Sequence, residues 1–390
     1  MHSTVEKAWR RLPRPIQDFI ASTLDRAQGV KVLPPPIIAD RAPIRVFVGP
    51  VNYAGQGFRW LRAAEQNPLV KSRTMVGAEN NPFGYEVDYA VRWRTMTHSR
   101  AWQRKMLDSL TTHYTHVIFE AQMPLLGGMF KQDIRRQIAA LRRGGVKVGM
   151  VCHGSDIRLP SRHRESEPWS YFANDDWVPV DRFEEEVQAN IDLLADVEAP
   201  TFVSTPGLLM DVPDGHLLPV VIDPAKWVNA APVLERARPR VLHVPTNPLP
   251  KGTMHIAPAL ARLHDEGVIE YIQLSGMSHS EMPSLYAAAD IMLDQFRVGD
   301  YGVASCEAMA AGRVVVGHVS DQAREAVKSV SGLDLPIVEA TIDTIEEVIR
   351  EIVANRDKYR AVAVAGPDFV RTTHDGRLAR AVLEQHFFEI

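Results

Sequence analysis

Four short segments of this chain carry the polar and glycine residues that could do chemistry. They are residues 49–58, 151–161, 243–255 and 298–312. Each segment follows a short apolar run typical of a buried strand and leads toward a helical or turn-forming pattern. Ligands of doubly wound parallel sheets bind beyond the carboxyl ends of the strands. The four segments therefore hold the candidate site residues.

Segment 298–312, VGDYGVASCEAMAAG, places one acid, Glu307, among small residues near the start of a predicted helix. A helix start favours negative charge even without a ligand, so Glu307 could simply stabilise the helix. The alternative is a carboxylate that accepts hydrogen bonds from ligand hydroxyls, as acidic residues do for ribose in nucleotide sites. We favour the ligand-binding interpretation.

Segment 243–255, HVPTNPLPKGTMH, places Lys251 before Gly252 and Thr253, at another predicted helix start. The helix dipole favours anions at this point, and a lysine supplies a point charge for phosphate. The G-x-x-x-x-G-K pattern of a Walker loop is absent. A solvated surface lysine is the alternative.

Segment 151–161, VCHGSDIRLPS, crowds His153, Asp156 and Arg158 at the end of a predicted strand. Polar side chains there suit hydrogen bonds to a polyhydroxylated substrate, and a histidine could act as a general base. A metal site is disfavoured because no second His or Cys stands at ligand spacing. Alternatively, Asp156 only caps the next turn.

Segment 49–58, GPVNYAGQGF, follows the first predicted strand. Gly55 and Gly57 would let the backbone approach a ligand, and the helix start beyond them offers N–H groups to an anion. The segment lacks the G-x-G-x-x-G spacing of a dinucleotide fingerprint, and its glycines could equally be turn residues.

The whole chain has the composition of a globular protein. It has 390 residues, 45% hydrophobic and 24% charged, which favours two domains. A net charge of −4 argues against a nucleic-acid partner. Two distant cysteines, the lack of a signal peptide and the lack of a membrane-spanning run favour a cytoplasmic protein.

Strand and helix patterns alternate in two series, which begin near Ile44 and Pro239. We expect strands at 44–49, 116–121, 146–154, 200–205, 216–223, 240–244, 269–276, 290–295, 313–316 and 336–340. We expect helices at 58–66, 130–145, 180–196, 253–267, 280–289, 320–330, 342–362 and 375–387. Short strands buried on both faces predict parallel sheets, and two series predict two doubly wound domains with a cleft between them.

Residues 1–42 are interpreted as an N-terminal extension with helix candidates at 6–12 and 16–27, followed by a Pro-rich connector. Their apolar face and arginines allow peripheral contact with the cytoplasmic face of a membrane. We favour a helix packed on its own domain, or a mobile tail.

Taken together, the segments resemble those of the retaining GT-B glycosyltransferases with the E-x(7)-E signature (glycosyl transferases group 1, family 4-like). The resemblance covers roughly residues 44–390 and rests on YAAADIMLDQFRVGDYGVASCEAMAAGRVVVG, PLPKG and CHGSD. It implies the α/β GT-B fold, with two Rossmann-like doubly wound domains facing a central cleft. The expected limits are 43–225 for the acceptor domain and 239–370 for the nucleotide-sugar donor domain. Residues 371–390 are expected to form a helix that crosses back to the N-terminal domain.

The resemblance also implies roles for individual residues. Catalysis would depend on His153 at the transferred sugar, Lys251 at the diphosphate and Glu307 at the ribose. The donor would further contact Gly55, Gln56, Gly57, Asn247, Gly252, Met277, Gly302 and Val303. Asp156 and Arg158 would contact the acceptor. Segments 77–105 and 157–180 would recognise it.

The activity implied is transfer of a sugar from a nucleotide-diphosphate donor to an acceptor hydroxyl with retention, as in a hexosyltransferase. The acceptor would be a glycan, a lipid-linked molecule or a small molecule, and neither a cofactor nor a metal is expected. One departure is Gly299, which stands where the family has its first glutamate; Asp300, Asp294 and Arg297 lie nearby. A scaffold or partner subunit without catalysis, and a GT-B sugar epimerase, are the alternatives.

Overall fold

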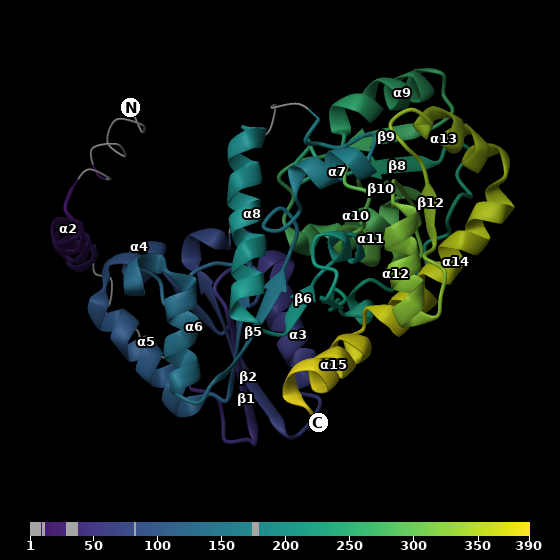
Figure 1. Cartoon of the computed structure of the whole chain (residues 1–390). Coiled ribbons are helices and arrows are strands. Elements are labelled where there is room, and N and C mark those ends of the chain that lie inside the picture. The colour runs from purple at the N-terminus through teal and green to yellow at the C-terminus, as the bar shows by residue number, and fades with distance from the viewer. Residues whose placement is uncertain (1–8, 10–11, 29–37, 82, 174–178) are drawn as a thin grey trace. The chain divides into compact units, whose positions relative to one another are not determined.

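The computed structural model describes residues 9, 12–28, 38–81, 83–173 and 179–390 (Figure 1). It contains two sheets, with strand orders β3-β2-β1-β4-β5-β6-β7 and β12-β11-β10-β8-β9. Neighbouring strands, such as β1 with β4 and β10 with β11, pair in parallel. The predicted α/β fold with two doubly wound parallel sheets is therefore confirmed.

Twelve strands form the two sheets in the described residues. The seven-stranded sheet contains β1 (Ile44–Gly49), β2 (Val70–Gly77), β3 (Tyr89–Val91), β4 (His116–Glu120), β5 (Lys147–Cys152), β6 (Thr201–Val203) and β7 (His216–Leu217). The five-stranded sheet contains β8 (Arg240–His243), β9 (Glu270–Gln273), β10 (Ile291–Leu293), β11 (Val314–Gly317) and β12 (Ile337–Glu339).

The helices connect these strands along the chain. Those before β8 are α2 (Arg14–Ala27), α3 (Gln56–Ala64), α4 (Trp93–His98), α5 (Arg100–His113), α6 (Ile134–Arg143), α7 (Pro160–Ser166) and α8 (Val180–Val197). Those after it are α9 (Thr253–Asp265), α10 (Met282–Ala288), α11 (Val303–Ala310), α12 (Asp321–Ser331), α13 (Ile345–Ala354), α14 (Arg356–Thr373) and α15 (Arg377–Leu383).

Most predicted elements are present, and the differences have local causes. The expected strand at 216–223 is shorter, because Pro219 cannot donate a ladder hydrogen bond. The expected helix at 342–362 is two helices, with a break at Asn355 (φ −119°). Segment 77–105, where no strand or helix was expected, contains β3, α4 and the start of α5.

The described chain divides into two compact units, each with its own apolar core. The first comprises residues up to 151 together with 193–201 and 387–390; the second comprises 152–192 and 202–386. Fully buried side chains from β1, β4 and β5 fill the first core, among them Phe47, Phe119 and Met150. Side chains from β8, β10 and β11, among them Val241 and Val314, fill the second.

Helix α2 is docked on α4 within the first unit. The buried Asp25 pairs with Arg94, and Asp18 accepts a hydrogen bond at 3.0 Å from His98 Nδ1. Phe19, also on α2, is 71% exposed. The packing expected for 16–27 is therefore observed, whereas most of the helix expected at 6–12 lies outside the described residues. Among the described helices, none combines the length and apolarity that a bilayer crossing requires.

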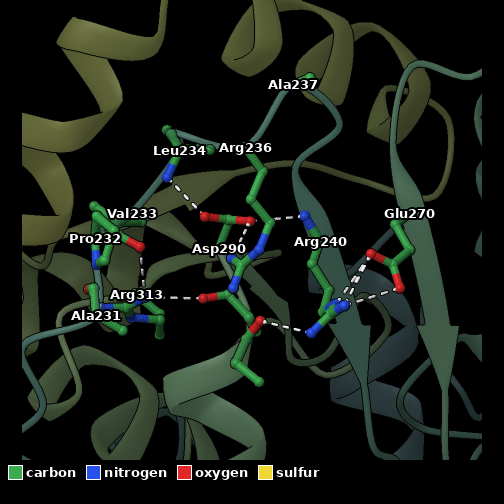
Figure 2. A network of polar contacts seen from close by, with 12 residues as sticks. Ala231, Pro232, Val233, Leu234, Arg236, Ala237, Arg240, Glu270, Asp290 and Arg313 are labelled. Atoms are coloured by element: carbon green, nitrogen blue, oxygen red, sulfur yellow. Dashed lines mark hydrogen bonds and ion pairs between the residues drawn. The ribbon is translucent and has the colours of Figure 1, made fainter.

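A buried carboxylate connects the amino-terminal ends of strands in the five-stranded sheet (Figure 2). Asp290, fully buried before β10, accepts hydrogen bonds from Leu234 N at 2.8 Å, Arg236 at 2.9 Å and Arg240 N at 2.8 Å. Arg313, before β11, donates to the carbonyl of Ala289 at 2.9 Å. These contacts fix the starts of β8, β10 and β11, so the opposite ends of the same strands are held in register.

Candidate functional site

The loop between β8 and α9 is fixed by a neutral histidine. His243 is buried at the end of β8; its Nδ1 lies 3.0 Å from the carbonyl of Leu293, and its Nε2 lies 2.8 Å from Thr253 Oγ1. Burial lowers the pKa of His243 to about 4, so Nδ1–H donates and Nε2 accepts from the hydroxyl. The start of α9 is thereby tied to the ends of β8 and β10.

Lys251 lies in this loop, directly before the start of α9. Gly252 has φ +74°, and an added Cβ would lie 3.2 Å from Phe296 Cβ, so glycine is required there. The ammonium of Lys251 pairs with Asp294 at the end of β10. Asp294 is 3% exposed while Lys251 remains 19% exposed, so the cation still faces outward.

Helix α11 begins beside this ion pair with a backbone that is open to a ligand. Ser305, in its first turn, donates to the second oxygen of Asp294. In the described residues no side chain caps the helix start, and a Cβ on Gly302 would meet no atom within 4 Å. The N–H groups from Val303 onward are therefore presented at a half-buried, uncapped helix start, which suits an anion.

Glu307 lies one turn further along α11 and is 3% exposed. Its Oε1 is 2.7 Å from Nε2 of His279, which follows β9 in the same loop as the half-buried Met277. This contact connects the predicted ribose-binding carboxylate to the loop of Met277, which was predicted to contact the donor. Asn247, by contrast, uses its side-chain oxygen locally and accepts from Leu249 N at 3.2 Å.

The segment before α11, residues 298–301, is held at every residue. His163 Nε2 lies 3.1 Å from the carbonyl of Val298, and Ser320 donates to the carbonyl of Gly299 from both N and Oγ at 3.0 Å. Burial lowers the pKa of His163 to about 3, so this imidazole is neutral. The segment is therefore preorganised, and only Gly302 beyond it faces open space.

Tyr301, the last residue of segment 298–301, is buried. Its hydroxyl lies 3.1 Å from Nε2 of His374, which directly follows α14. His374 Nδ1 lies 2.8 Å from the carbonyl of Val220. Burial lowers the pKa of His374 to about 4, so Nδ1–H donates to that carbonyl and Nε2 accepts from the tyrosine.

The three polar residues near Gly299 all have other partners. Asp300 is buried and accepts from Arg158 at 3.3 Å and from Gly207 N at 3.1 Å. Burial raises the pKa of Asp300, while the Arg158 guanidinium opposes that shift. Arg297 donates to backbone carbonyls at 169 and 170, and Asp294 holds Lys251 as described above.

The space beside Gly299 is filled instead by the side chain of Glu167, the residue that follows α7. Gly299 has φ +67°, and an added Cβ would lie 2.1 Å from Oε1 of Glu167, which follows α7. The other carboxylate oxygen of Glu167 lies 2.7 Å from His318 Nε2, and His318 Nδ1 lies 2.6 Å from Glu339. Burial lowers the pKa of His318, but the hydrogen bonds to the two carboxylates outweigh it and raise the pKa to about 9. No pattern along the chain predicts this arrangement, because its residues come from separate segments.

Segment 153–158 lies in the second unit, next to these residues. Asp156 accepts from His153 N at 3.0 Å and from Gly154 N at 2.6 Å, so its carboxylate holds the turn. Arg158 is buried against Asp300 and connects this turn to the segment before α11. His153 is half-buried, and its carbonyl accepts from Ser204 at 3.2 Å.

The predicted Gly55–Gly57 segment belongs to the first unit. Gly55 has φ +72°, and a Cβ on Gly57 would lie 2.9 Å from Oε1 of Glu120. Glu120, fully buried at the end of β4, also accepts from Val51 N at 3.1 Å and Asn52 N at 2.9 Å. Gln56, between the glycines, is 2% exposed. Glu120 is a second residue that the sequence analysis missed, although an acid at a strand end is a recognisable signal.

The second unit thus gathers most of the predicted site residues around the start of α11. Contacts connect Lys251 to α11 through Asp294, Glu307 to the loop of Met277 through His279, and Arg158 to the segment of Gly302 through Asp300. Chemically, the site offers a cation, free helix N–H groups and a buried carboxylate. This set can bind a phosphate and a hydroxylated group at the same time.

The sequence matches no protein-family model and no curated protein. Solved structures, however, match over most of the chain. The sucrose-phosphate synthase of Thermosynechococcus elongatus is 13% identical, with a TM-score of 0.58, 90% of this chain covered and 99% of that chain. Anabaena HepE, solved with UDP and glucose, is 11% identical, with a TM-score of 0.56, 88% of this chain covered and 99% of that chain.

A third match is the catalytic domain of starch synthase IV from Arabidopsis thaliana, bound to ADP and acarbose. It is 10% identical, with a TM-score of 0.52, 90% of this chain covered and 99% of that chain. At these identities the likeness is one of fold. Together with the two parallel sheets, it shows that the chain has the GT-B fold.

Proposed function

We propose that this protein is a glycosyltransferase that moves a sugar from a nucleoside-diphosphate donor to an acceptor hydroxyl with retention of configuration. The observation that carries the proposal is the arrangement around α11. An uncapped helix start with open space at Gly302, the cation Lys251 and the buried carboxylate of Glu307 lie together in the second unit. Two of the structures of similar fold were solved with UDP or ADP, which supports a nucleotide as the ligand.

In this proposal each group acts on one part of the donor. The N–H groups at Gly302 and Val303 and the ammonium of Lys251 bind the diphosphate. Glu307 accepts hydrogen bonds from the ribose hydroxyls, for which it exchanges its contact with His279. His153, Asp156 and Arg158 would contact the transferred sugar and the acceptor.

Retention follows if the acceptor attacks from the face that the diphosphate leaves. The bond between the anomeric carbon and the diphosphate oxygen breaks, and the acceptor oxygen bonds to that carbon. The acceptor proton passes to the leaving diphosphate. The protein therefore contributes positive charge and positioning rather than a covalent intermediate. Lys251 and the α11 start supply that charge in this proposal, with no metal ion.

Thermal unfolding with UDP, ADP or GDP tests the nucleotide site. A ligand at 100 times its Kd stabilises the native state by about 2.7 kcal/mol, so one nucleotide should raise Tm clearly. Glu307→Ala should abolish that rise, whereas Glu325→Ala on the outer side of α12 is the matched control and should keep it. If no nucleotide raises Tm of the wild type, the proposed function is wrong.

Turnover and stereochemistry are tested separately. Release of nucleoside diphosphate from the matching sugar nucleotide reports catalysis, and proton NMR of the product reports the anomeric configuration. Gly299 favours a second candidate, a GT-B scaffold that binds the nucleotide without catalysis. Nucleotide binding without any sugar transfer or hydrolysis would support that scaffold and refute the enzyme.

A further inference from the structure

Glu167 is a largely buried acid of the second unit, and the proposed nucleotide site assigns no role to its carboxylate. Glu167 is 6% exposed and sits where the side chain of residue 299 would point. Its Oε2 accepts a hydrogen bond from Nε2 of His318, whereas its Oε1 has no hydrogen-bond partner among the described residues. One acceptor oxygen of a largely buried acid is therefore left available.

Glu167 also lines a hollow in the second unit. The wall includes Arg158, Arg162, Gly299 and Ser320 besides Glu167 itself. Both guanidiniums are already paired, Arg158 with Asp300 and Arg162 with Asp211 at 2.6 Å. Figure 1 shows α7, which precedes Glu167, among the elements of this unit.

The charges around the hollow select the kind of ligand. A cationic ligand would be repelled by Arg158 and Arg162, and an anionic one by the carboxylates of Glu167, Asp211 and Asp300. A neutral hydrogen-bond donor fits both conditions. A hydroxyl group can donate to Oε1 of Glu167, and hydrogen bonds to charged groups are stronger than neutral ones.

The hollow lies close to the proposed diphosphate position. Gly299 precedes Gly302 by three residues, and an extended chain spans at most about 3.6 Å per residue, so their Cα atoms are within roughly 11 Å. The groups that hold residues 298–301 keep this separation fixed. A sugar attached to a diphosphate at the α11 start is the hydroxylated group nearest to the hollow.

We propose that Glu167 is the residue of this chain that recognises the transferred sugar, by accepting a hydrogen bond from one of its hydroxyls. The assignment rests on the proposed function. His318 is the positioning residue: it holds the carboxylate through Nε2 and is itself held by Glu339 through Nδ1. Glycine at 299 is required because any larger residue would occupy the place of the Glu167 carboxylate.

The test compares Glu167→Gln with Glu339→Gln by titration calorimetry. Both variants remove one carboxylate from His318, but only Glu167 faces Gly299 and the hollow. The pairs UDP and UDP-glucose, ADP and ADP-glucose, and GDP and GDP-mannose are the probes. The quantity measured is the ratio of the Kd for the diphosphate to the Kd for its sugar nucleotide.

We expect Glu167→Gln to lower this ratio about tenfold while the Kd for the diphosphate stays unchanged. Glu339→Gln should lower the ratio less than Glu167→Gln does, because Glu339 acts on the Glu167 carboxylate only through His318. An unchanged ratio in Glu167→Gln, or an equal fall in both variants, would overturn the assignment while leaving the proposed nucleotide site intact. A wild type that binds none of the six probes would overturn the proposed function, and the assignment with it.

If Glu167→Gln does not fold, Glu167→Asp is measured in the same way. It keeps the charge beside His318 but withdraws the carboxylate by one methylene. The same fall in the ratio is expected, and an unchanged ratio overturns the assignment.

Discussion

Removal of Lys251 should affect stability and nucleotide binding through separable contacts. Its ammonium pairs with Asp294, which is 3% exposed and also accepts from Ser305. Lys251→Met leaves that carboxylate buried with a single hydroxyl donor. Removing one partner of a buried ion pair costs about 3–5 kcal/mol because the remaining charge is uncompensated. We expect the lower end, about 3 kcal/mol, since Lys251 is 19% exposed and Ser305 still donates.

A second substitution separates the two effects. In Lys251→Met combined with Asp294→Asn, the buried charge is gone and an amide keeps the contact with Ser305. The free energy of unfolding should therefore return to within about 1 kcal/mol of the wild type. Nucleotide affinity should not return, because the cation is still missing. The loss of a charge-assisted hydrogen bond, about 1.5–3 kcal/mol, corresponds to roughly 10–150-fold in Kd.

Urea unfolding and titration calorimetry with the diphosphate that binds the wild type measure these quantities. Asp294→Asn alone is the control, because it retains Lys251 and should retain most of the affinity. Two results would refute the reasoning. The first is a Lys251→Met protein as stable as the wild type, and the second is a double variant that binds the diphosphate with wild-type affinity.

Three further predictions concern the frame of the site. Asp290→Ala should lower the free energy of unfolding, measured in urea, by about 3–5 kcal/mol, because Leu234 N, Arg236 and Arg240 N in the network of Figure 2 lose the carboxylate that accepts their hydrogen bonds; an unchanged value would contradict this role. Gly299→Ala should destabilise by more than the roughly 1–2 kcal/mol of a left-handed alanine, because Cβ meets Glu167; adding Glu167→Ala should relieve the excess, and equal values in both would contradict the collision. His243 and His374, with pKa lowered to about 4, stay neutral in the folded state while the unfolded chain protonates near 6.5. Stability should therefore fall between pH 6.5 and 4 by up to about 1.4 kcal/mol per pH unit for each histidine, and His243→Asn should flatten the slope measured by urea unfolding.

Much of the fold could be predicted because its strands are continuous apolar runs. IRVFVG and RVLHV form β1 and β8 where expected, and both lie in parallel sheets. Strand β2 was missed because VKSRTMVG is interrupted by polar residues, although Ser72 and Thr74 are buried. Their polar groups are satisfied by neighbours such as Asp88, which no local pattern reveals.

The candidate site could be predicted from the sequence where a single segment carries the signal, but not where two separate segments meet. Glu307 and Lys251 stand at helix starts that the sequence marks, but their partners His279 and Asp294 come from other loops. Glu167 is the clearest case, because only the fold brings it to Gly299. Pairings of this kind follow from tertiary packing and not from spacing along the chain.

The contact between Tyr301 and His374 has a consequence for the end of the chain. Through it, the last turn of α14 and the backbone at Val220 support the residue directly before Gly302. A chain truncated before residue 374 would leave a buried tyrosine hydroxyl without its acceptor at the entrance to α11. The C-terminal region therefore supports the start of α11, where the donor is proposed to bind, and shortened versions of the protein should be designed to retain it.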